Sequence, residues 1–254
     1  MKILPRETDF YSIKGDNLEM LQIRLNNKPV FAEAGKMVYM KGRVSMDTRL
    51  STKEDKGFLG KILEAGERIM AKESLFLTYF EGIGEVGFAG DFPGRIIPVQ
   101  LNREVIYAQR DAFLAGMGDI EISVALQRNL RGALFGGEGF ILEKISGEGI
   151  VFLHAGGDLI HFSLGSGETI RVDTGCAVAW DGSVAYDIQL IKNIKTSIFG
   201  GEGLFLNTLT GPGRVIIQTM PITRLRRELS ITSDSSQKSG FLAGLLGGML
   251  SKDI

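Results

Sequence analysis

Apolar and polar residues alternate along most of this chain, in short runs that are separated by glycine-rich turns. Runs such as 18–25 and 30–33 follow the period of two that is typical of a β-strand. Further strands are predicted at 95–101, 105–109, 159–164 and 169–173. The alternation predicts a mostly β protein.

One motif recurs along the sequence. Phe135-Gly136-Gly137-Glu138-Gly139 returns unchanged at 199–203, and a weaker copy surrounds Glu73. A second landmark precedes each copy, at Gly35, Asp111 and Gly175. A regular spacing near 65 residues predicts a single body, 1–221, made of three similar units at about 18–94, 95–157 and 158–221. The repeat landmarks, which we interpret as structural corners, are Glu73, Gly136, Gly137, Glu138, Gly139, Gly200, Gly201, Glu202 and Gly203.

Each landmark glutamate is followed by a strand, a glycine-containing turn and another strand. The turns fall at 81–84, 146–149 and 210–213, which predicts three equivalent hairpins. A further turn is expected at 101–104. Helical spacing at 58–70, 124–131 and 188–195 predicts a few short helices, although the last two could equally be strand ends.

The pattern changes after Pro221. Residues 222–239 form a polar linker, and 240–254 form a Gly/Leu-rich tail. On a helix, one stripe of the tail would gather Phe241, Leu242, Leu245, Leu246, Met249 and Leu250. This tail would dock onto its own or a neighbouring subunit, enter a membrane surface, or remain disordered.

Composition narrows the class of protein. Twenty-nine basic and 30 acidic residues give a net charge of -1, which does not favour a polyanionic partner. The single cysteine, Cys176, lies in an apolar run and is interpreted as a buried structural thiol. Residues 1–10 hold no apolar core of the kind that a secretory signal needs, and no apolar run in the chain is long enough for a membrane span, so we expect a cytoplasmic protein.

The candidate chemistry is sparse. The glycine-rich landmarks could bind an anion through backbone N–H groups, but their glutamate would repel it. His154 and His161 are weak metal candidates because they lie seven residues apart, unlike the closely spaced histidines of cupin metal sites. No catalytic set and no cofactor are predicted.

The duplicated Phe-Gly-Gly-Glu-Gly motif, the Gly-Glu-Gly turn at 147–149 and the segment 34–38 resemble the family of the altered-inheritance-of-mitochondria protein 24. The resemblance covers about 18–221. It implies three units in a pseudo-threefold arrangement, each similar to the tryptophan RNA-binding attenuation protein (TRAP), a short double-stranded β-helix. It also implies assembly into homo-oligomers, and it establishes no biochemical activity.

The leading functional expectation is a non-enzymatic homo-oligomer that acts as a scaffold or as a platform for protein or membrane-surface interactions. One alternative is an RNA- or small-ligand-binding module, although nucleic acid is disfavoured because only Arg224, Arg226 and Arg227 cluster. A less favoured alternative is a metal-dependent β-helix enzyme that uses the two histidines.

Overall fold

A computed structural model describes residues 1–50, 76–128, 140–190, 205–226 and 229. Within these ranges the protein is mostly antiparallel β-structure, which confirms the predicted class. Helical structure is limited to two 3-10 turns, Arg110–Ala112 and Thr174–Cys176, and a short helix at 222–226. The strands are β1 (Lys2–Ile3), β2 (Tyr11–Lys14), β3 (Met20–Asn26), β4 (Val30–Glu33), β5 (Met37–Leu50), β6 (Phe76–Ala89), β7 (Gly94–Gln109), β8 (Phe113–Arg128), β9 (Phe140–Gly156), β10 (Leu159–Leu164), β11 (Thr169–Asp173), β12 (Ala177–Asp181), β13 (Ala185–Leu190), β14 (Phe205–Thr210) and β15 (Gly213–Gln218).

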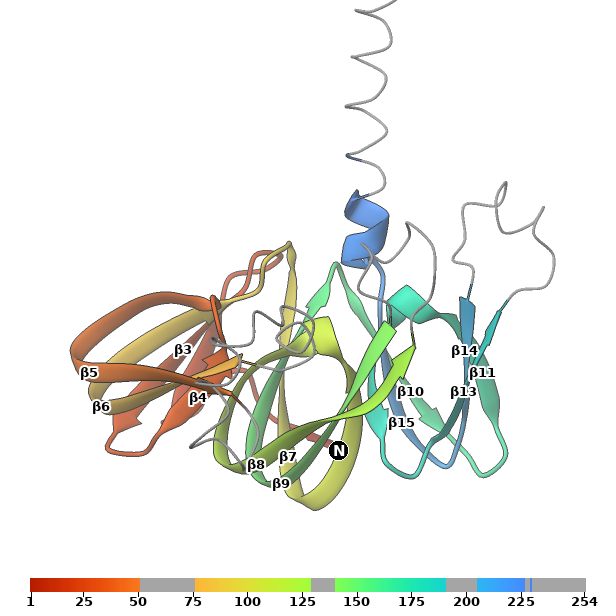
Figure 1. The fold of residues 1–254 in the computed structure, drawn as a ribbon, viewed down its shortest axis with the longest axis horizontal. Coiled ribbons are helices and arrows are strands. Elements are labelled where there is room, and N and C mark those ends of the chain that lie inside the picture. Colours follow the sequence, from red (N-terminus) through yellow and green to blue (C-terminus); the bar gives the residue numbers. More distant parts are fainter. Residues whose placement is uncertain (51–75, 129–139, 191–204, 227–228, 230–254) are drawn as a thin grey trace, which may run out of the picture.

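The three sequence segments lie side by side along the long axis of the molecule (Figure 1). The first segment (red to gold) is at one end, the second (yellow to green) in the middle, and the third (teal to blue) at the other end. In the first segment β6 pairs with β3 and β4 on one side and with β5 on the other. The second segment has the same plan, because β9 lies between β7 and β8.

The third segment follows this plan with strands that are divided in two. Strand β15 pairs with β10 and β12, and β14 pairs with β11 and β13. The pairs β4–β8 and β7–β12 then join the first segment to the second and the second to the third. The result is a 12-stranded sheet and a 3-stranded sheet.

The first two predicted hairpins are wrong. Strands β6 and β9 run without interruption through the turns predicted at 81–84 and 146–149. At the third predicted turn β14 and β15 are separate strands, but they belong to different sheets and do not pair with each other, so no hairpin forms there either. The glycines serve close strand approach instead: a Cβ on Gly82 would lie 2.1 Å from the Arg43 carbonyl oxygen, and one on Gly147 would lie 2.0 Å from that of Asp119.

Other predicted turns and helices are also strands in the structure. The turn expected at 101–104 is a register shift within β7, where Arg103 adopts a φ of 65°. The described parts of the two ambiguous helical patterns, 124–128 and 188–190, are strand ends of β8 and β13. The pattern at 58–70 lies outside the described residues. Continuous pairing with a neighbouring strand therefore prevailed over local turn and helix preferences.

A β-bulge follows the second landmark in every segment. The register shifts between Met37 and Tyr39, between Phe113 and Ala115, and between Ala177 and Ala179. These positions follow Gly35, Asp111 and Gly175 at the same distance. Residues that occupy the same place in the strand pairing of their segments are called counterparts below. Matching bulges are expected of a repeat. The pseudo-threefold arrangement of TRAP-like units itself stays a prediction.

Each segment has a hydrophobic core, and neighbouring segments share side chains with it. The first core contains Leu21, Ile23 and Phe88 together with Leu114 from β8 of the second segment. The second core contains Val178 from β12 of the third segment. The third core is centred on Trp180. The joined segments are thus held by apolar insertion as well as by strand pairing.

Candidate functional site

The repeated glycine and glutamate landmarks cannot be placed. Glu73, Gly136, Gly137, Glu138, Gly139, Gly200, Gly201, Glu202 and Gly203 all lie outside the described residues. The apolar tail residues Phe241, Leu242, Leu245, Leu246, Met249 and Leu250 also lie outside them. Their roles as structural corners and as an interaction tail stay predictions.

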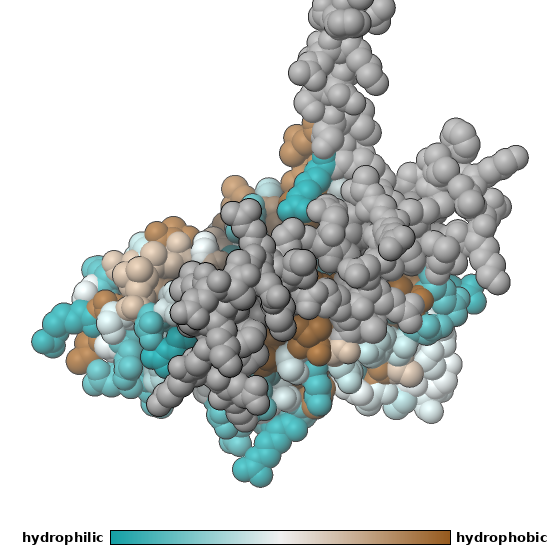
Figure 2. Space-filling model, viewed as in Figure 1, coloured by the Kyte–Doolittle hydropathy of each residue, from teal (hydrophilic) through white to brown (hydrophobic). Residues whose placement is uncertain are grey.

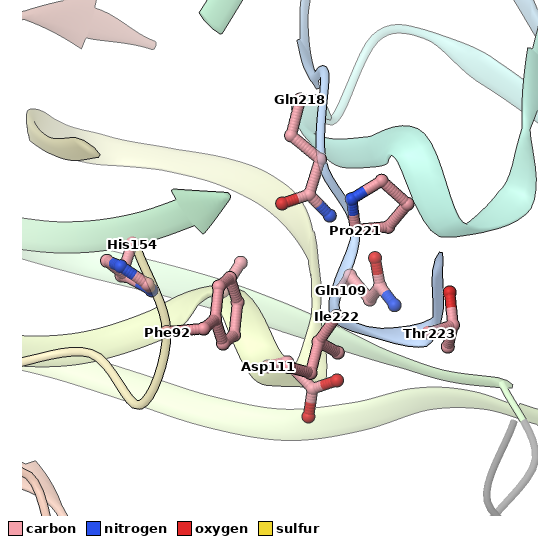
Figure 3. Close-up of a pocket in the computed structure, with 9 residues that line it drawn as sticks. Phe92, Gln109, Asp111, His154, Gln218, Pro221, Ile222 and Thr223 are labelled. Carbon is pink, nitrogen blue, oxygen red and sulfur yellow. The ribbon is translucent and has the colours of Figure 1, made fainter. Parts of the chain in front are cut away.

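The structure places His154 in a closed corner between the second and third segments (Figure 3). Its ring packs edge-on against Phe92, with the ring centroids 4.7 Å apart. A Cβ on Gly90 would lie only 2.3 Å from the imidazole, so glycine there makes room for the ring. Burial, reinforced by the positive charge of Lys36, lowers the pKa of His154 to about 4. The histidine is therefore a neutral core residue at ordinary pH.

The two histidines belong to different strands. His154 pairs with Ile96 on β7, whereas His161 is exposed on β10 and pairs with Ile216 on β15. The described residues contain no group of three or more His, Cys, Asp or Glu side chains that could hold a metal ion. The two histidines lie in different environments, one buried and one exposed. The corner beside His154 also has a volume of only about 10 Å³, room for about one water molecule.

The sequence analysis missed two carboxyl groups, the buried Glu143 and the partly buried Glu33, that interact electrostatically with Asp111 at this corner. Burial and the nearby charge of Glu33 raise the pKa of Glu143 well above its usual value. Burial also raises the pKa of Glu33, although Lys36 opposes that change from 3.3 Å. The Glu143 Oε2 atom has no hydrogen-bond partner within the described part of the chain. At neutral pH these groups therefore favour their protonated forms more than exposed carboxyls do.

A sequence pattern could have identified Glu143. It lies five residues after a landmark glutamate, and the residues at the same distance in the other segments are Thr78 and Asn207. All three side chains are buried polar groups in strands that are otherwise apolar. A polar residue repeated at one strand position predicts a special environment. It does not define a reaction.

Cys176 is half-buried beside the third core. Burial raises the pKa of its thiol, and the negative charge of Asp173 acts in the same direction. Its Sγ atom lies 3.9 Å from the Arg224 Nη2 atom. These features agree with a structural rather than a reactive thiol.

A groove on the third segment has a volume of about 620 Å³. The charged residues among those that line it are Arg171, Asp173 and Arg224. Asp173 and Arg224 approach each other at 3.9 Å. The apolar residues that line the groove are Ile160, Phe162, Ile170, Val172 and Ile217.

The opposite end of the molecule carries an exposed apolar strand edge. Val38 and Met40 on β5 are 55% and 38% exposed, although they belong to a β-strand next to the first core. Hydrophobic residues reach the surface at this end of the molecule among hydrophilic ones (Figure 2). Among the described strands, β5 pairs only with β6. The groove lies on the third segment and this edge on the first, at opposite ends of the molecule (Figure 1).

Within the described ranges, no helix has both the length and the apolar character that crossing a membrane requires.

Comparison with known proteins places the chain in a family. Over 213 residues it is 32% identical to an uncharacterised protein of Streptococcus pyogenes serotype M6, M6_Spy0233, and the match covers 81% of this chain and 84% of that protein. The crystal structure of SPYM3_0169 from Streptococcus pyogenes superimposes with a TM-score of 0.70 at 26% identity, covering 87% of this chain and 98% of that one. The family model described as mitochondrial biogenesis AIM24 matches residues 11–220. The chain therefore belongs to the AIM24 family, as the repeated motifs predicted.

Proposed function

We propose that the protein is a non-enzymatic β scaffold that assembles from copies of itself and offers the assembled surface to other molecules. One observation supports this most directly. An apolar strand edge lies exposed at one end of the molecule, and an apolar groove lies at the other. Exposed strand edges and apolar patches are where β proteins join further chains.

The surroundings of His154 and Glu143 indicate that these titratable residues have a structural role. The ring of His154 is enclosed by Phe92, and the adjoining cavity is too small for an organic substrate. The buried carboxyl of Glu143 lies in a strand core rather than in an accessible cleft. We therefore assign these groups to folding, and the absence of enzymatic activity remains part of the proposal. A cytoplasmic location stays a prediction from the sequence.

Light scattering coupled to gel filtration tests self-assembly. At micromolar concentration the full chain is expected to elute with a mass that is a multiple of 27.7 kDa. A strictly monomeric mass across the micromolar range would refute the scaffold proposal. It would also leave the 620 Å³ groove open, which favours the small-ligand alternative because drug-sized ligands occupy pockets of this size.

A further inference from the structure

The two junctions inside the chain use one register. At the first junction β4 pairs with β8, with Ala32 opposite Ala115 and Phe31 opposite Gly116. At the second junction β7 pairs with β12 through the counterparts of those residues, with Ala108 opposite Ala179 and Tyr107 opposite Trp180. The same pairing therefore joins the first segment to the second and the second to the third.

Each junction also inserts one apolar side chain into the core of the preceding segment. Leu114 is fully buried in the first core, and its counterpart Val178 is 1% exposed in the second. The first core, into which Leu114 is inserted, includes Leu21, Ile23, Val30, Ala32 and Phe88, which we call its receiving residues. Their counterparts around Val178 are Ile97, Val99, Ile106, Ala108 and Leu153.

An inserting residue and a set of receiving residues for a third such junction are also present. Within the described residues, neither of them has a neighbouring segment. The third inserting residue is Val38, the counterpart of Leu114 and Val178, and it is 55% exposed. The third set of receiving residues lines the groove: Ile160, Phe162, Ile170, Val172 and Ile217. Ile160 is 44% exposed, whereas its counterparts Ile97 and Leu21 are 3% and 0% exposed. Ile160 is thus exposed at the position that is covered in the two internal junctions, where the next segment lies alongside.

The two halves cannot meet within the chain as it is folded here. Strand β5 lies at one end of the molecule and β11 toward the other (Figure 1). Among the described strands, β11 pairs only with β14, in the 3-stranded sheet, and no described strand lies on its other side. Because the donor and the acceptor are at opposite ends, a second copy of the chain is the partner that has the matching surface.

We propose that β5 of one copy pairs with β11 of the next and places Val38 in its groove, repeating the internal junctions. This inference rests on the proposed self-assembly and identifies the contact that produces it. The internal register places Tyr39 opposite Val172, Met40 opposite Arg171 and Lys41 opposite Ile170. No like charges lie directly opposite at these positions, so the pairing carries no direct cross-strand repulsion.

The contact is head-to-tail, because it joins two different surfaces. Each added copy leaves one β5 edge and one groove free at the ends of the assembly. A head-to-tail contact closes into a ring when the rotation between copies allows it, and otherwise it extends into a filament. The apolar valine supplies burial, and the three backbone pairs fix the register.

A charge substitution tests the role of Val38. Val38→Asp places a carboxylate in the apolar groove, so the assembly mass is expected to fall to that of the monomer, 27.7 kDa. Val38 is exposed in the single chain, and the variant should therefore retain its fold by circular dichroism. Ile83→Asp is the matched control, because Ile83 is 49% exposed and its counterpart Glu148 is also exposed. The control should keep the wild-type mass.

Disulfide trapping tests the register. In a Cys176→Ser background, Met40→Cys combined with Arg171→Cys should give a ladder of covalent oligomers on a non-reducing gel. Directly opposed strand residues have Cα atoms about 4.5–5.5 Å apart, within the range that a disulfide spans. Either cysteine alone should give no ladder.

Specific outcomes would overturn the inference while leaving the scaffold proposal intact. These are a wild-type mass for Val38→Asp, a cross-link formed by Met40→Cys alone, or a cross-link confined to one chain. A fall to the monomer mass on removing residues 240–254, with Val38→Asp unaffected, would mean that the tail of another copy occupies the groove, and it would also overturn the inference. A wild-type protein that is monomeric would refute both proposals.

Discussion

The buried imidazole of His154 should make the stability of this protein depend on acid in a way that one substitution removes. The folded-state pKa is lowered to about 4, whereas an unfolded histidine titrates near about 6.5. Between these values the unfolded chain binds a proton that the folded chain rejects. The contribution of His154 to stability is therefore complete above about pH 6.5 and declines as the pH falls toward 4.

The size of the effect follows from the two pKa values. Linkage gives a loss of about 1.4 kcal/mol per pH unit within the window, or about 2 kcal/mol between pH 7.5 and pH 5. His154 is only 4% exposed, so solvent screening does not reduce this figure much. His154→Gln is the suitable change, because the counterpart of His154 in the third segment is the buried Gln218.

Urea denaturation at pH 7.5 and pH 5, at equal protein concentration, provides the measurement. At pH 7.5 His154→Gln should be less stable than the wild type, because it loses the ring contact with Phe92. At pH 5 the difference should shrink by about 2 kcal/mol. His161→Gln, a change at an exposed strand position, should keep the acid sensitivity of the wild type. A stability difference between wild type and His154→Gln that does not change with pH would refute the reasoning.

Three further changes test the buried groups, the strand contacts and the junctions. Glu143→Gln should gain stability relative to wild type as the pH rises from 5 to 8, by up to about 1.4 kcal/mol per unit. The reason is that the unfolded wild-type carboxyl releases its proton in this range while the folded one, whose pKa is raised, retains it, so wild-type stability falls with pH. An unchanged difference in urea denaturation would contradict this. In Gly147→Ala the new Cβ would lie 2.0 Å from a carbonyl oxygen at a φ of +119°, so the variant should lose about 3 kcal/mol or more of unfolding free energy, measured by thermal unfolding. Gly167→Ala has open space around it and should lose about 1 kcal/mol. Equal losses would count against the steric argument. Leu114→Ala should cost about 2–5 kcal/mol in urea because it empties a fully buried site at the first junction, and a cost below about 1 kcal/mol would show that the junction contributes little.

The alternation of apolar residues was sufficient to predict the class of structure and many strand positions. Strands at 18–25 and 30–33 were predicted within a few residues of β3 and β4. The landmarks at Gly35, Asp111 and Gly175 predicted corresponding positions, and a β-bulge follows each of them. Side-chain periodicity is a local property of a strand, which is why the sequence reveals it.

The glycine-rich segments were misread because a turn and a close strand crossing require the same residue. Gly82 and Gly147 both adopt positive φ, as they would in a hairpin turn. Their conformation instead lets a continuous strand pass close to the carbonyl group of its partner. Only the position of the partner strand distinguishes the two cases, and the partner is distant in sequence.

The features of the candidate interaction surfaces also differ in whether the sequence or the fold reveals them. The order and spacing of the residues were enough to establish the apolar alternation, the repeated motif and membership of the AIM24 family. The folded chain was needed to see that Leu114 and Val178 are buried by a neighbouring segment while Val38 is not. All three have the same kind of apolar side chain in corresponding places. Burial depends on which segment lies alongside, and that is set by strand pairing between parts of the chain that are far apart in sequence.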